Sequence, residues 1–183
     1  MLGKTFGSGL LARVASRPEE DVERVLSSLV RKEVLSLQAD PRSPEHGQYG
    51  FLQDLVRHVT YETLSRRDRK LRHLAAADQV AAALGDEVPE VVAAHLAAAV
   101  EAAPEAADAL EIRQRAGRMY VLAAERAERL AAAGEAQRFF EQAVDLADDP
   151  VAKAELTDRA GRMAWVANRT DDARRLLERA RSG

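Results

Sequence analysis

The chain of 183 residues contains no cysteine, and only 4% of its residues are aromatic. The absence of cysteine excludes disulfides, thiol catalysis and thiolate metal ligands, and it fits a reducing compartment. No run approaches the roughly 18 to 20 uncharged apolar residues that span a membrane, and no charged and then apolar signal pattern opens the chain. We therefore expect a cytoplasmic protein that has no membrane segment.

Alanine supplies about a fifth of the chain. Because alanine favours helices and lets them approach closely, we expect helix-on-helix packing. The charge is unevenly shared: residues 1–75 carry 13 Lys and Arg against 10 Asp and Glu, whereas residues 76–183 carry 14 against 20. The length leaves room for two small domains, and the charge balance favours a protein partner over nucleic acid.

The N-terminal part begins with two helical patterns. Residues 8–15 form a short helical segment, and Ser16 with Glu19 predicts a capping box for a second helix with Pro18 in its first turn. The apolar residues of this second helix recur at helical spacing and are expected to share one buried face: Val22, Val25, Leu26, Leu29 and Val30.

Two strand-like runs follow, over residues 34–38 and 48–52, and the segment between them contains Pro41 and Pro44. Prolines at these positions predict the tip of a β-hairpin. A helix is expected next, over residues 54–64. The order of two helices, a hairpin and a further helix is that of a winged helix whose first helix is short or missing.

The remainder of the chain is helical, with interruptions at residues 85–89, 104, 133–134 and 148–150. An offset of 37 residues aligns a pattern of small and large side chains: Ala124 with Gly161, Ala127 with Ala164, Ala136 with Ala173, Phe140 with Leu177, and Ala143 with Ala180. The pattern resembles tetratricopeptide repeats, in which small residues let paired helices approach. We predict a mainly α protein, with a winged helix and small β-hairpin in residues 1–66 and a tetratricopeptide-like helical array in residues 67–183.

One segment links the hairpin to the next helix and carries the triplet Leu52-Gln53-Asp54, followed by Leu55-Val56-Arg57. This frame resembles the methionine-histidine-aspartate motif, followed by leucine-valine-arginine, in the winged helix of STAND-class signalling NTPases. The order of a winged helix and tetratricopeptide-like helices is similar to the region after the ATPase domain in bacterial STAND proteins. Further segments resemble the group linked to class III adenylate or guanylate cyclases: residues 2–6, 29–35, 49–61 and 66–77.

The resemblance implies a regulatory role in signal transduction. In the family, the motif histidine is thought to sense the phosphates of a nucleotide held by a separate ATPase domain, so a relay role is implied for Gln53 and Asp54, with Arg57 supporting that interface. A glutamine amide donates a hydrogen bond but cannot carry the charge of an imidazolium. ATP or ADP is then expected in an upstream ATPase domain, with no cofactor in this chain, which we expect to be part of a longer polypeptide.

Catalytic signals are weak. Gly3-Lys4-Thr5 matches the end of a phosphate-binding loop, but the leading glycine and the preceding strand that build the loop are missing. Four histidines are scattered without the spacing of metal ligands: His46, His58, His73 and His95. No serine lies in a nucleophile-elbow context, and no pair of carboxylates is distinguished from the acidic residues of solvated helices. We expect no enzymatic activity and no metal in this chain alone.

The densest basic cluster lies at the junction of the two expected domains: Arg66, Arg67, Arg69, Lys70 and Arg72. Such a cluster contacts phosphates or an acidic partner, or it simply faces water at the start of a helix. DNA reading by the second helix is a further alternative, which its acidic first turn disfavours because carboxylates repel phosphates.

Two interpretations of function therefore stand. The first is a non-catalytic regulatory and protein-interaction module of a STAND-type ATPase, and the alternative is a winged-helix transcription regulator with a tetratricopeptide-like sensor. For the array, Phe139, Phe140 and Trp165 either line a groove for a peptide or pack in the helical core. Aromatic residues at helical spacing favour the core.

Overall fold

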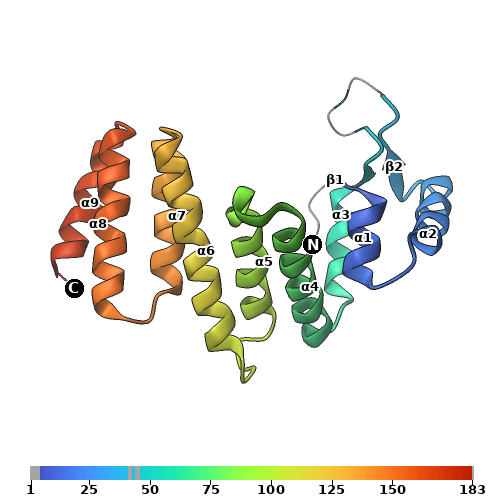
Figure 1. Ribbon diagram of the computed structural model, residues 1–183, viewed down its shortest axis with the longest axis horizontal. Coiled ribbons are helices and arrows are strands. Elements are labelled where there is room, and N and C mark those ends of the chain that lie inside the picture. Colours follow the sequence, from blue (N-terminus) through green and yellow to red (C-terminus); the bar gives the residue numbers. More distant parts are fainter. Residues whose placement is uncertain (1–4, 41–42, 44–45, 183) are drawn as a thin grey trace. The chain divides into compact units, whose positions relative to one another are not determined.

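The computed structural model describes residues 5–40, 43 and 46–182 (Figure 1). Its helices and short strands confirm a mainly α fold in which a winged helix is followed by a helical array. The strands are β1 (Thr5–Phe6), β2 (Leu35–Leu37) and β3 (Tyr49–Phe51). The helices are α1 (Ser8–Ala15), α2 (Glu19–Arg31), α3 (Asp54–Glu62), α4 (Arg66–Leu84), α5 (Pro89–Ala102), α6 (Ala109–Arg129), α7 (Ala133–Leu146), α8 (Pro150–Val166) and α9 (Thr170–Ser182), with a short 3-10 turn, η1 (Gly85–Glu87), between α4 and α5.

The chain divides into two compact units, one up to Gln79 and one from Val80 onward. The division falls inside α4, whereas the expected domain boundary between residues 66 and 67 falls at the start of that helix. The expected boundary stays a prediction. Among the described residues, none of the helices combines the length and the apolar character needed to cross a membrane.

The first unit contains a three-stranded antiparallel sheet in the order β1-β3-β2. β3 pairs with β2 through Leu37 and Tyr49, and it pairs with β1 through Phe6 and Tyr49. The core between the sheet and the two N-terminal helices is built from Ala12, Val22, Leu26 and Leu35. The predicted hairpin is thus present, and β1 is an additional strand that a two-residue pattern does not reveal. Pro41 and Pro44 at the expected hairpin tip, and Gly3 and Lys4 of the loop-like motif, lie outside the described residues.

Two local predictions in this unit are wrong. Ser16 does not cap α2: it has a left-handed backbone (φ 52°) and ends α1, and Pro18 takes the N-cap position of α2 without a side-chain hydrogen bond. Val25 is 59% exposed, although Val22 and Leu26 on the same helix are buried. Val25 lies three residues from Val22, at the edge of the apolar stripe, and the small core does not extend to it.

In the second unit each helix packs against the next, from α5 to α9. The core of its C-terminal half contains the fully buried Phe140 of α7, which packs with Ala136 of the same helix and with small residues of α6 and α8: Ala124, Ala160 and Ala164. Small side chains on both sides of a large one allow a close approach of the helices. This packing is repeat-like, as the sequence predicts.

Residues that are 37 positions apart also share the same backbone conformation at the turns of the array. Ala131 and Asn168 both have a left-handed conformation, with φ of 56° and 60°, and each ends the first helix of a pair. One residue later the bonds also match, because Ala132 N–H donates to Ala127 O over 2.9 Å and Arg169 N–H donates to Ala164 O over 2.8 Å. The α6–α7 and α8–α9 pairs therefore close with the same turn.

Candidate functional site

The expected relay residues lie at the N-terminus of α3. Gln53 is the N-cap residue, with an extended backbone (φ −132°, ψ 124°), and its side chain makes no capping hydrogen bond. Asp54 opens the helix, where a carboxylate interacts favourably with the positive end of the helix dipole. Both side chains are exposed. The structure therefore presents an amide and a carboxylate at the surface, next to each other.

Arg57 lies one turn further along α3. Its Nε is 3.5 Å from Asp54 Oδ1, and the two side chains are 39% and 65% exposed. The Nε itself is buried and makes no hydrogen bond within the described part of the chain. A partly exposed pair at this spacing stabilises a helix by only about 0.3 kcal/mol. Arg57 thus stays close to Asp54 without being strongly held.

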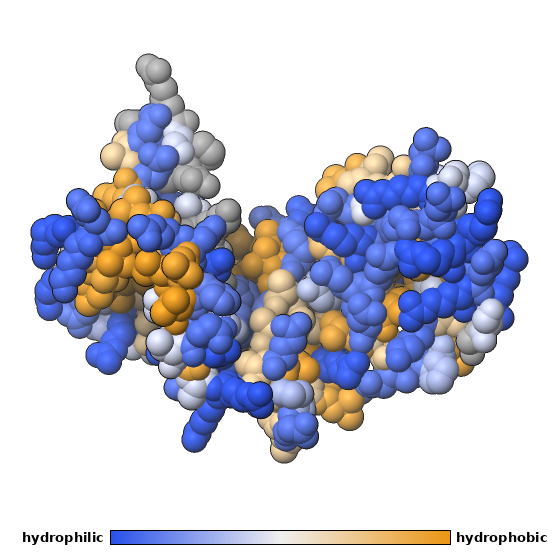
Figure 2. Space-filling model, turned by 180° about the vertical axis from the view of Figure 1, so that it is seen from behind, coloured by the Kyte–Doolittle hydropathy of each residue, from blue (hydrophilic) through white to orange (hydrophobic). Residues whose placement is uncertain are grey.

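Apolar side chains flank this corner. Leu52 is 54% exposed, Leu55 69% and Val59 52%. Leu55 and Val59 are four residues apart on α3, so they lie on the same side of the helix. Figure 2 shows a broad apolar area on the winged-helix unit. Exposed apolar side chains therefore lie next to Gln53 and Asp54.

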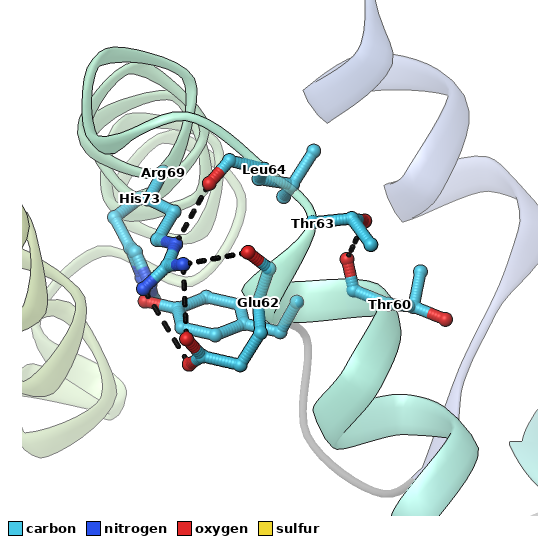
Figure 3. A network of polar contacts seen from close by, with 7 residues as sticks. Thr60, Glu62, Thr63, Leu64, Arg69 and His73 are labelled. Atoms are coloured by element: carbon cyan, nitrogen blue, oxygen red, sulfur yellow. Dashed lines mark hydrogen bonds and ion pairs between the residues drawn. The ribbon is translucent and has the colours of Figure 1, made fainter.

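The end of α3 is tied to the start of α4 by a polar network around Arg69 (Figure 3). Arg69 donates to Leu64 O over 3.1 Å and to Glu62 O over 2.9 Å, and its Nη2 lies 3.1 Å from a carboxylate oxygen of Glu62. Its guanidinium carbon also lies 4.8 Å from the centre of the Tyr61 ring. These contacts fix the angle of the chain between the two helices.

His73 completes the network from the next turn of α4. Its Nε2 and the Tyr61 hydroxyl are 3.1 Å apart, and the two rings meet edge to face. His73 is buried, so this hydrogen bond satisfies a polar group that water does not reach. The sequence shows a scattered histidine here, and the structure places it as a core residue.

The basic cluster is split in the structure. Arg69 serves the network just described, with its side chain 20% exposed, while Arg66, Arg67 and Arg72 are exposed. Lys70 is half-buried. The helix start they share is already capped, because Asp68 N–H donates to Ser65 Oγ over 3.0 Å and Ser65 Oγ–H donates back to Asp68. Because Arg69 is engaged with Leu64 and Glu62, it does not join the other basic residues of the cluster in a site for a phosphate from outside the chain.

The acidic residues near the start of α2 have a structural role. Ser8 Oγ donates to the Glu19 carboxylate over 3.0 Å and lies 3.4 Å from that of Glu23. A β-carbon at Gly9 would lie 3.1 Å from the same Glu19 oxygen. The two carboxylates thus lie beside the N-terminus of α1, which has no side-chain cap of its own, and they satisfy its positive end. They also place negative charge where a DNA-reading helix needs cations.

The structure does not bring together the three aromatic residues considered for a peptide groove. Phe140 is fully buried, with the Arg159 guanidinium carbon 4.3 Å from its ring centre. Phe139 stacks on Tyr120 with their ring centres 6.3 Å apart. Trp165 is 66% exposed on α8. Of the three, Trp165 alone is freely available to a partner.

A polar link between α7 and the loop before α9 has no signal in the sequence. Gln137 is only 3% exposed, donates to Glu141 over 3.2 Å, and accepts a hydrogen bond of 3.2 Å from Arg169. Sequence periodicity predicts only that the position of Gln137 is buried. The identity of its partner depends on how the two helix pairs stack.

The titrating groups with shifted pKa values serve the core or the surface. Burial lowers the pKa of His95 and raises the pKa of the Tyr120 hydroxyl. A hydrogen bond from Arg175 lowers the pKa of the exposed Asp172. In the part of the chain that the structure describes, no cluster of three histidine or acidic side chains is arranged to hold a metal ion.

Comparison with known proteins gives no further guide, because no protein-family model, no curated protein and no solved structure matches this chain.

Proposed function

We propose that the chain is a non-catalytic regulatory and protein-interaction module of a bacterial STAND-type signalling ATPase, of the kind linked to class III nucleotide cyclases. In this proposal the module works in the cytoplasm. Its winged helix contacts an upstream ATPase domain, which holds ATP or ADP, and its helical array binds a protein or peptide. Nucleotide state is thereby coupled to partner binding.

One observation carries the proposal. Gln53 and Asp54 stand side by side at the exposed start of α3, and exposed leucines lie on both sides of them. A corner that combines a hydrogen-bond donor, a carboxylate and an apolar surface is suited to docking on another domain. The order of the two units supports the same assignment.

Gln53 determines how the proposed relay interacts with the ATPase domain. Its amide donates hydrogen bonds at any physiological pH, whereas a histidine at this position changes its charge between about pH 5 and 8. In the proposed relay Gln53 contacts the ATPase domain or its nucleotide as a neutral donor. Asp54 supplies the charge, and Arg57 lies close to the Asp54 carboxylate from one turn away.

The test of this proposal is the reading frame that encodes the native polypeptide, together with the intact mass of that polypeptide. We expect the same polypeptide to contain a phosphate-binding loop and an acidic Mg²⁺-binding strand several hundred residues before Gln53. A native polypeptide without these two motifs contradicts the STAND assignment. The winged-helix topology also suits a transcription regulator, and that alternative is tested by the DNA measurement described in the Discussion.

A further inference from the structure

The helix α3 is held mainly at its two ends. No side chain of α3 is buried, and Leu55 and Val59 are 69% and 52% exposed, whereas Val22 and Leu26 anchor α2 in the core. Helices shorter than about 12 residues are unstable alone in water, because their own hydrogen bonds do not offset the cost of ordering the chain. Since apolar burial contributes little to α3, the contacts at its ends decide how it is held.

The N-terminal end of α3 is tied to the sheet. β3 ends at Phe51, and the next residue, Leu52, donates its N–H to Val34 O over 3.2 Å, directly before β2. Gln53 and Asp54 follow as the N-cap and the first residue of the helix. The proposed relay residues therefore lie where the helix leaves the sheet.

The C-terminal end of α3 is tied to α4 by Arg69 (Figure 3). The last carbonyl groups of a helix have no partner within that helix. Arg69 donates from Nη2 to Glu62 O over 2.9 Å and from Nε to Leu64 O over 3.1 Å, and Nη2 also donates to the Glu62 carboxylate. A cation at a helix C-terminus interacts favourably with the helix dipole as well. Arg69 is thus a C-terminal cap of α3 that the next helix supplies, and we call this set of contacts the Arg69 clasp.

Other contacts fix the position of the Arg69 clasp. The guanidinium carbon lies 4.8 Å from the centre of the Tyr61 ring, and the Tyr61 hydroxyl lies 3.1 Å from Nε2 of the buried His73. Ser65 caps the turn of α4 that carries Arg69, because its Oγ accepts from Asp68 N–H over 3.0 Å. A planar guanidinium donates in several fixed directions at once, which an ammonium group does not reproduce. The geometry therefore requires an arginine here and not simply a positive charge.

We infer that Arg69 is a positioning residue whose clasp joins α3 and the first turns of α4 into one cooperative unit. Through this unit a displacement of Gln53 and Asp54 is transmitted to α4. The inference rests on the proposed function, because it names the route by which the relay residues act on the rest of the module. The clasp lies in the first unit, and α4 itself continues past Gln79 into the second.

Hydrogen exchange in this chain tests the clasp. Arg69→Gln removes the charge and the planar fork, and it is expected to speed the exchange of residues 54–62 about tenfold or more, since a hydrogen bond from a charged group contributes about one decade or more to local stability. Arg69→Lys keeps the charge and is expected to behave like Arg69→Gln. Arg72→Gln is the matched control, because Arg72 is exposed on the same helix, and it is expected to leave this exchange unchanged.

Two comparisons separate the clasp from a general effect on stability. Exchange of residues 8–31, which cover α1 and α2, is expected to stay at the parent rate in all three variants. An equal acceleration there in Arg69→Gln overturns the inference, since the arginine then supports the whole unit. Unchanged exchange of residues 54–62 in Arg69→Gln overturns it too, and so does full protection of this segment in Arg69→Lys.

The transmission step is tested in the native polypeptide with bound ATP analogue and with ADP. We expect the protection of residues 66–79 to differ between the two states in the parent and to be equal in Arg69→Gln, while residues 52–57 still differ in both proteins. A difference at residues 66–79 that persists in Arg69→Gln overturns the inference and leaves the proposed function intact. Equal protection of residues 52–57 in the parent contradicts the proposed function, and the exchange of residues 54–62 in the chain alone then still decides whether the clasp holds α3.

Discussion

Gly161 on α8 faces Leu177 on α9 so closely that a β-carbon at Gly161 would lie 2.8 Å from Leu177 Cγ. The equivalent pair in the preceding helix hairpin is Ala124 with Phe140, both fully buried. A planar ring leaves room for a methyl group, whereas the branched leucine requires hydrogen at that point. The two helix hairpins have the same turn, and different pairs of residues fill the equivalent position between their helices.

Gly161→Ala is expected to destabilise the array by about 1–3 kcal/mol, because overpacking outweighs the gain in helix propensity. Gly117→Ala is the matched control in α6, where the nearest atom to the new β-carbon is Leu146 Cβ at 3.7 Å. This control is expected to stabilise the protein by about 0.5–1 kcal/mol. Urea unfolding followed by circular dichroism measures both. Equal effects of the two substitutions contradict the close packing of α8 on α9.

Arg159 connects the two helix pairs. Its Nη1 donates to Glu125 Oε1 over 3.0 Å, and its guanidinium covers the ring of Phe140. Arg159→Gln is expected to lower the free energy of unfolding by about 1 kcal/mol. Arg162→Gln is the control: that side chain is 71% exposed and pairs only with Asp158 of its own helix among the described residues, so its loss is expected to cost about 0.3 kcal/mol. An equal cost for both variants rules out a special role for Arg159.

His95 predicts a pH dependence of stability. Burial lowers its pKa from the ordinary value of 6.5, so the folded chain prefers the neutral imidazole. The unfolded chain then binds the proton more readily, and the free energy of unfolding falls as the pH drops below about 6.5. Urea unfolding at pH 7.5 and 5.5 is expected to show a smaller loss in His95→Gln than in the parent. The exposed His58→Gln is expected to behave like the parent, and identical losses in all three proteins contradict the prediction.

Binding to duplex DNA separates the two interpretations of function. Because Glu19, Glu20 and Asp21 make the first turn of α2 acidic, we expect no saturable binding of a fluorescent 20-base-pair duplex at about 0.15 M salt. Fluorescence anisotropy at several salt concentrations measures this. Specific binding with a steep salt dependence favours the transcription regulator instead.

The isolated chain is also expected not to retain ATP, since the proposal places the nucleotide in a separate domain. Equilibrium dialysis with radiolabelled ATP and Mg²⁺ tests this expectation. Saturable binding at micromolar concentration contradicts it and makes Gly3-Lys4-Thr5 the first candidate for the ATP-binding residues.

The helical array is predictable from sequence because its packing depends on where small and large residues recur. The 37-residue offset between Ala127 and Ala164 is visible in the letters, and it reappears in two matching backbone hydrogen bonds. The first strand is different, since Thr5–Phe6 is too short to show alternation and is defined by its pairing with β3. Ser16 illustrates the same limit: its residue type suits a helix start, but its backbone ends the previous helix.

The candidate site is less predictable than the fold. The sequence pattern places Gln53 just before a helix and Asp54 at its start, and the structure adds that both are exposed. Which arginine of the basic cluster is engaged depends on the angle between α3 and α4, so Arg69 cannot be separated from Arg66 by spacing alone.

The central claim is that the start of α3 responds to nucleotide state. Hydrogen exchange of the peptide covering residues 52–57, measured in the native polypeptide with bound ATP analogue and with ADP, tests it most directly. We predict clearly different protection of this peptide in the two states, while the peptides of α6 and α7 in the array serve as internal controls. Equal protection of residues 52–57 in the two states contradicts the account.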